Sequence, residues 1–72
     1  MSIWKKIRTD KNIKISEFAK KVGYSVQSIW HFERGDRPMP IKLQIEYLKL
    51  RNSDKDKIII NYLIERLEDK NV

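Results

Sequence analysis

Hydrophobic residues recur three and four positions apart along most of the chain, and this spacing predicts short α-helices. The expected helices cover Ile3 to Thr9, Lys14 or Ile15 to Val22, Val26 to Arg34, Pro40 or Ile41 to Leu50, and about 54 to 69. Two prolines make residues 35–40 a loop. A short break is expected at residues 51–53, where Ser53 can cap the last helix. The pattern predicts an all-α fold, a compact five-helix bundle in one domain that spans residues 1–72.

The second and third expected helices are joined by a very short connection. Gly23 can adopt the positive φ that ends a helix, and Ser25 can accept a hydrogen bond from the N–H groups that open the next one. Gly35 closes the third helix in the same way. Two helices joined by such a turn form a rigid corner that can present one helix to the major groove of DNA.

The charge of the chain is unevenly distributed. Residues 1–52 contain 12 Lys and Arg against 5 Asp and Glu, whereas residues 53–72 contain 4 against 5. The basic excess therefore lies with the helical corner, in a body suited to a polyanion such as DNA. The carboxylates of the tail, among them Asp54 and Asp56, are expected on a solvated helix face.

The third helix has two chemically different sides when its residues are placed 100° apart. Ile29 and Phe32 mark the buried side. The expected base-reading residues, on or beside the outward side, are Val26, Gln27, Trp30 and His31. The expected phosphate contacts are Lys14, Ile15 through the helix N-terminus, Ser25, Ser28, Arg34 and Arg37.

Each outward side chain has a specific chemistry. The Gln27 amide can bind the N6 and N7 edge of adenine, and Val26 can contact a thymine methyl group. His31 can donate to phosphate or to a base acceptor. Trp30 is large for an outward position, so DNA, a partner subunit or the fourth helix is expected to cover it.

The segments Glu17-Phe18-Ala19, Val22-Gly23, Ser28-Ile29 and Glu33-Arg34-Gly35 together resemble the helix-turn-helix domains of the phage repressor and Cro (XRE-like) family. The resemblance extends over about residues 3–48. It implies a lambda-repressor-like bundle with the N-terminus of the third helix in the major groove, and it assigns Val26, Gln27 and His31 to base reading. It also implies an ion pair between Arg8 and Glu33. The chain departs from the family at Ile15, where many members carry a phosphate-binding Gln, and at Lys14, where a Ser or Thr cap is usual.

The last helix carries more hydrophobic residues than one small core needs. Ile60, Leu63, Ile64 and Leu67 form one stripe, and further apolar residues widen it. One interpretation is that the first and fourth helices cover the whole arc. The other is a homodimer that binds a palindromic operator, with an interface at Ile58, Ile59, Tyr62 and Leu63.

These observations favour a sequence-specific regulator of transcription, a repressor from a phage or mobile element, bound to double-stranded DNA. The alternative is a protein-interaction module on the same scaffold, which is antitoxin-like or is itself a repressor antagonist. If the chain is instead the regulator, a protein antagonist is a further possible partner. With no cysteine, a single histidine and no glycine-rich phosphate loop, we expect no enzyme activity, no metal and no cofactor. A cytoplasmic location in a bacterial cell or a phage-infected host is expected, with no membrane association.

Overall fold

The computed structural model describes residues 2–69, so the ends of the predicted domain, residue 1 and residues 70–72, lie outside it. Its elements are α1 (Ile3–Asp10), α2 (Ile15–Val22), α3 (Val26–Arg34), α4 (Ile41–Arg51) and α5 (Asp54–Asp69). The predicted all-helical architecture is confirmed, and α3 begins and ends where the sequence pattern placed it. Arg51 is the last residue of α4 and not part of a break. Within residues 2–69, no helix is long and apolar enough to cross a membrane.

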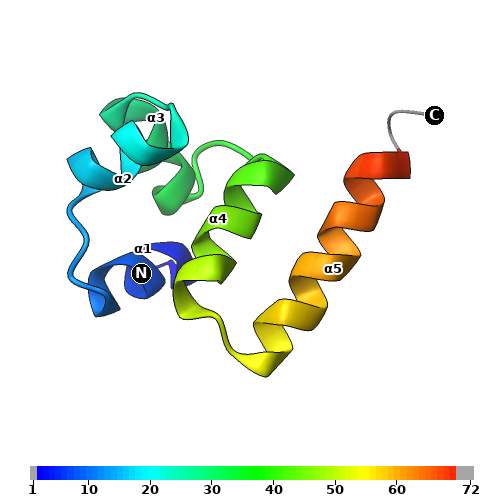
Figure 1. The fold of residues 1–72 in the computed structure, drawn as a ribbon. Helices are drawn as coiled ribbons and strands as arrows, with labels where there is room; N and C mark the ends of the chain where they lie inside the picture. Colours follow the sequence, from blue (N-terminus) through cyan, green and yellow to red (C-terminus); the bar gives the residue numbers. More distant parts are fainter. Residues whose placement is uncertain (1, 70–72) are drawn as a thin grey trace.

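The central element is α4, which lies between α5 on one side and α1, α2 and α3 on the other (Figure 1). Leu43 and Tyr47 of α4 join Phe18, Ala19 and Ile29 in the main core, all essentially removed from solvent. Two other α4 residues, Ile45 and Leu48, form a second buried cluster with Leu63 of α5. Because α4 is buried on two sides, it joins the helical corner and the tail helix into one packed unit.

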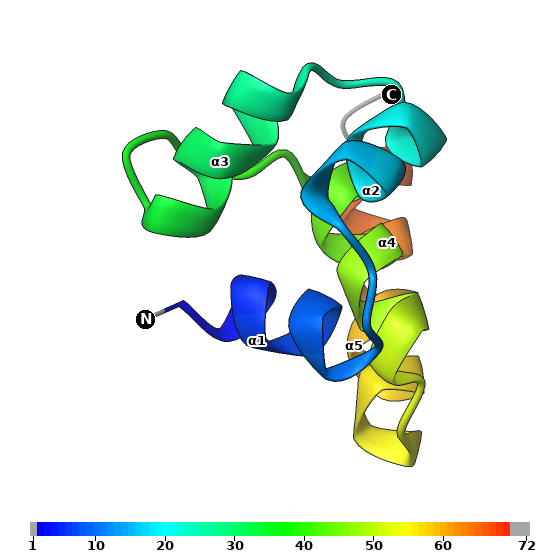
Figure 2. The same ribbon diagram turned by 90° about the vertical axis from the view of Figure 1, so that its left-hand side faces the viewer.

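The turn between α2 and α3 follows the predicted chemistry. Gly23 has φ of +79°, and its N–H and that of Tyr24 both donate to the Ala19 carbonyl, at 2.9 and 3.0 Å. These bonds satisfy the Ala19 carbonyl in the last turn of α2. Ser25 then caps α3, because its hydroxyl oxygen accepts from the Ser28 N–H at 3.1 Å. The two helices are thereby held in the fixed corner seen in Figure 2.

Two predicted environments were wrong, those of Leu63 and Asp56; in addition, Ile3 is 54% exposed and Ile64 also reaches solvent. Leu63, assigned to a dimer interface, is instead buried against Ile45 and Leu48, because α5 turns this side chain toward α4. Asp56, expected on a solvated face, is fully buried.

Asp56 forms the corner between α4 and α5. Its carboxylate accepts hydrogen bonds from the Arg51 guanidinium at 2.6 to 3.0 Å and from the Ser53 N–H at 2.9 Å, while the Ser53 hydroxyl accepts from the Asp56 N–H at 3.1 Å. This reciprocal pair is a capping box that starts α5, as the Ser53 cap predicted. The bonds from Arg51, and less strongly those from Ser53, hold the pKa of Asp56 below its usual range, although burial opposes them.

Replacing Asp56 with Asn should lower the melting temperature at pH 7, and the difference from the unmodified chain should shrink as the pH falls from about 4 towards 2. A carboxyl group whose pKa is depressed by folding stabilises the fold above its unfolded pKa of about 3.9 and loses that contribution as the pH falls toward its folded pKa. Thermal melts followed by circular dichroism across this pH range measure the difference. Asp54→Asn, at an exposed neighbouring carboxylate, is the control and should change little; a difference that is constant with pH would contradict the role of Asp56.

Candidate nucleic-acid interface

The outward face of α3 carries the side chains that the helical wheel placed there. Ile29 is fully buried, whereas Gln27, Arg34 and Val26 are exposed. Trp30 keeps 46% of its surface exposed, so α4 does not bury it in the core. The polar and aromatic groups of α3 are therefore available to a partner, as the sequence indicated.

Trp30 and Arg34 form a stacked pair on this face. The Arg34 guanidinium carbon lies 4.4 Å from the centre of the indole ring, and the imidazole of His31 meets the same ring nearly edge-on at 4.9 Å. A cation over an indole ring is attracted by the ring's negative face. This contact holds Arg34 against the helix surface without removing its charge from solvent.

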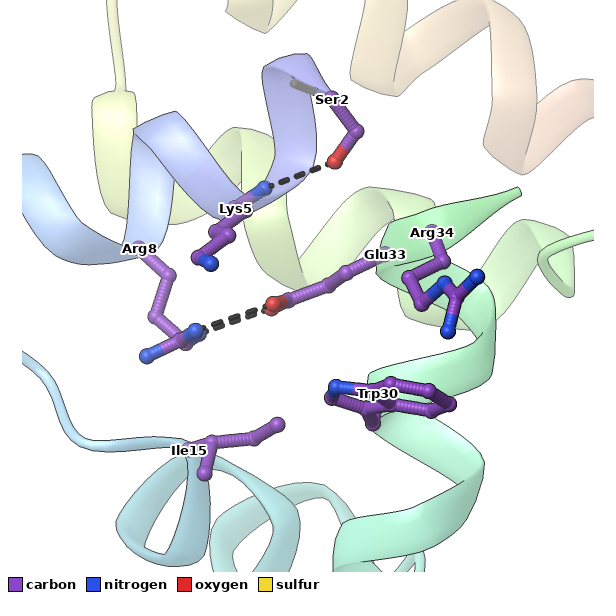
Figure 3. Close-up of a pocket in the computed structure, with 7 residues that line it drawn as sticks. All are labelled: Ser2, Lys5, Arg8, Ile15, Trp30, Glu33 and Arg34. Carbon is purple, nitrogen blue, oxygen red and sulfur yellow. Dashed lines mark hydrogen bonds and ion pairs between the residues drawn. The ribbon is translucent and has the colours of Figure 1, made fainter. Parts of the chain in front are cut away.

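A pocket of about 540 Å³ opens beside this stack, between α1, the start of α2 and α3 (Figure 3). Its lining consists of Ser2, Lys5, Arg8, Ile15, Trp30, Glu33 and Arg34. Three of these side chains are cationic and one is anionic, so the lining carries an excess of positive charge. Lys5, which the sequence reading did not single out, adds a cation from α1 to the α3 face.

Four of the predicted phosphate contacts, Lys14, Ile15, Ser25 and Ser28, lie at the starts of α2 and α3. Lys14 precedes α2 and is exposed, while the half-buried Ile15 side chain lines the pocket. At the start of α3, the Ser25 hydroxyl donates to the Ser28 hydroxyl oxygen at 2.9 Å, which leaves the Ser28 O–H hydrogen for a partner. Arg37 is exposed in the loop after α3.

A buried ion pair fixes α1 against α3 behind the pocket. Arg8 donates to both carboxylate oxygens of Glu33, at 2.7 and 2.9 Å, and to the Ile13 carbonyl at 2.7 Å. Tyr47 of α4 donates its phenol O–H to the same carboxylate at 2.7 Å. Burial, and then the bond to Glu33, raise the pKa of Tyr47 well above the ordinary tyrosine range, so this phenol remains a donor. Sequence reading missed Tyr47, because nothing local marks a core tyrosine as the partner of a distant carboxylate.

The polar groups of residues 2–69 do not form a metal site. In the part of the chain that the structure describes, no three His, Asp or Glu side chains gather where they could hold a metal ion. Among residues 2–69, Asp36 is the one acidic residue whose side chain contacts outward-facing residues of α3. Its carboxylate lies 3.1 Å from His31 Nδ1 and 3.6 Å from Arg34 Nε. Asp36 had no role in the sequence interpretation.

The fold and this face define a helix-turn-helix protein. The sequence profile of the helix-turn-helix family matches residues 5–45, more than half of the chain, so the chain belongs to that family. This confirms the resemblance to the Cro and C1 repressor type and places the chain among the DNA-binding helix-turn-helix regulators. Comparison with curated proteins and with solved structures found no match.

Replacing Glu33 with Ala should lower the free energy of unfolding by about 3–5 kcal/mol, because Arg8 is left buried without its partner. Tyr47→Phe removes only the donated O–H bond and should cost about 1.5–3 kcal/mol. Urea or thermal unfolding followed by circular dichroism measures both. Glu68→Ala, at an exposed carboxylate of α5, is the matched control, and an unchanged melting temperature for Glu33→Ala would count against the buried pair.

Proposed function

We propose that this protein is a sequence-specific repressor of transcription, from a phage or another mobile element, that reads the major groove of double-stranded DNA with α3. The observation that carries the proposal is the outward face of α3, where an amide, an apolar methyl-bearing side chain and a stacked cation are exposed on a helix held rigidly by buried contacts. Side chains that read base edges must be both accessible and precisely held.

The N-terminal half of α3 supports base reading. Gln27 presents an amide that matches the N6 and N7 edge of adenine, and Val26 presents methyl groups suited to thymine. Both are exposed on the first turn of the helix, which is the part that enters the groove in helix-turn-helix complexes. Trp30 and His31 lie one turn further along, beside the same groove in this proposal.

The surrounding cations and N–H groups support contacts to the phosphates on either side of the groove. Arg34, Arg37 and Lys14 are exposed, and Ile15 at the N-terminus of α2 lines the pocket. Phosphate contacts fix the register of the protein on the duplex, while base contacts supply the sequence preference. The positively charged pocket of about 540 Å³ beside Trp30 would receive sugar-phosphate backbone in this proposal.

Selection of bound duplexes from random DNA should yield a palindromic motif, and Gln27→Ala should lose preference at one base pair of it, by about 1–3 kcal/mol. Arg37→Ala should instead weaken binding to all sequences and reduce the salt dependence by about one counterion. Lys57→Ala, on α5, is the matched control with the same charge change. Failure to bind any duplex at low salt, together with tight binding to another protein, would overturn the proposal in favour of the interaction module.

The exposed face of α5 supports a homodimer. Ile58 is 70% exposed and Tyr62 is 56% exposed, and Ile59 also reaches solvent. Adjacent exposed hydrophobic side chains of this size commonly mark an interface. A two-fold dimer through this face would bring two copies of α3 to the two halves of a palindrome.

Ile58→Lys should convert the dimer to a monomer without lowering the stability of the folded chain, because the Ile58 side chain has few contacts to lose. Light scattering on a size-exclusion column at micromolar concentration measures the mass. Leu63→Ala is the contrasting variant, since this residue packs inside the chain and its truncation should cost about 2–5 kcal/mol of folding stability. A monomer already in the unmodified protein, bound to a single half-site, would remove the dimer.

A further inference from the structure

The chain reverses direction at the end of α3 and places Asp36 against His31. Gly35 has φ of +86°, and the Asp36 N–H donates to the His31 carbonyl at 3.0 Å. This backbone bond brings the Asp36 carboxylate back over the last turn of α3, where its Oδ2 lies 3.1 Å from His31 Nδ1. Two hydrogen bonds therefore link the same two residues, one through the backbone and one through the side chains.

The carboxylate determines which ring nitrogen of His31 carries hydrogen. An ionised carboxylate has only acceptor sites, so Nδ1 must be the donor in this contact. A neutral imidazole has a single N–H, and if Nδ1 carries it, Nε2 becomes an acceptor. Nε2 lies across the ring from the contact with Asp36, and no residue of the described chain hydrogen-bonds to it.

We propose that Asp36 is a positioning residue that fixes His31 as the Nδ1–H tautomer, so that His31 Nε2 accepts a hydrogen bond from the exocyclic amino group of an adenine or a cytosine. This inference rests on the proposed DNA-binding function. In the major groove only these two bases present a donor, whereas guanine and thymine present acceptors at the corresponding edge. His31 therefore selects a base that donates, which revises the expectation that it donates to a base or to phosphate.

The surroundings of His31 keep the imidazole in place for this role. The Trp30 ring meets it edge-on at 4.9 Å, and the Asp36 carboxylate bonds its Nδ1 at 3.1 Å. Arg34 Nε lies 3.6 Å from the same Asp36 oxygen, a longer contact than that of the imidazole. Gln27 lies one turn earlier on the same face of α3, so the base read by His31 should neighbour the one read by Gln27.

The tautomer can be measured in the free protein, since His31 is the only histidine of the chain. Long-range proton–nitrogen spectra at pH 8, where an ordinary imidazole is neutral, should show a protonated Nδ1 and an unprotonated Nε2. In Asp36→Ala the balance should move toward the Nε2–H form, which is the commoner one for histidine in water. Asp69→Ala, which removes an exposed carboxylate at the end of α5, should leave the spectrum unchanged. A dominant Nε2–H form in the unmodified protein would overturn the inference.

The base contact is tested on the duplex that the protein selects. Replacing single adenines by purine, or cytosines by pyrimidin-2-one, removes the amino group. At one position this should weaken binding of the unmodified protein about two- to tenfold, and of His31→Ala hardly at all. Asp36→Ala should lose part of the same discrimination. Tight binding with no position sensitive to the amino group would overturn this base contact alone, whereas no binding to any duplex would overturn the proposed function and the base contact together.

Discussion

The carboxylate of Glu33 is the point on which the rest of the structure depends. It lies on α3 and is bonded by Arg8 of α1 and Tyr47 of α4, so one buried group fixes the mutual positions of three helices. A buried pair of this kind adds little net stability, because desolvation offsets its attraction, but it strongly disfavours other arrangements. In this chain the arrangement it specifies is the one that leaves Gln27, Trp30 and Arg34 of α3 exposed to solvent.

Local signals explain why much of the fold could be predicted. A glycine with positive φ, a serine cap and apolar spacing act within a few residues of each other, so Gly23, Ser25 and Gly35 mark the limits of α2 and α3 directly. The outward side of α3 followed from periodicity alone. The family resemblance identified Arg8 and Glu33 as an ion pair. The two residues are 25 positions apart, so no local rule could have paired them.

The features that escaped prediction depend on how helices are placed relative to one another. Spacing showed that α5 is broadly apolar, but only the packing angle against α4 decides that Leu63 is buried and Ile64 is not. In the sequence, Asp56 looks like an ordinary exposed carboxylate in the first turn of a helix. Its burial depends on the turn between α4 and α5, which brings Arg51 beside it. Asp36 follows a helix stop, and its approach to His31 requires the chain reversal at Gly35.

The two tryptophans occupy opposite kinds of environment. Trp4 packs against Tyr47, with ring centres 5.5 Å apart, whereas Trp30 is exposed to solvent and stacked with the Arg34 guanidinium. Indole emission depends on its surroundings, so the chain contains two natural optical probes. Light from Trp4 reports whether the helices are assembled, and light from Trp30 reports what touches the α3 face. Trp30→Phe would leave Trp4 as the one tryptophan, so the contribution of Trp30 would follow from the difference between the two emission spectra.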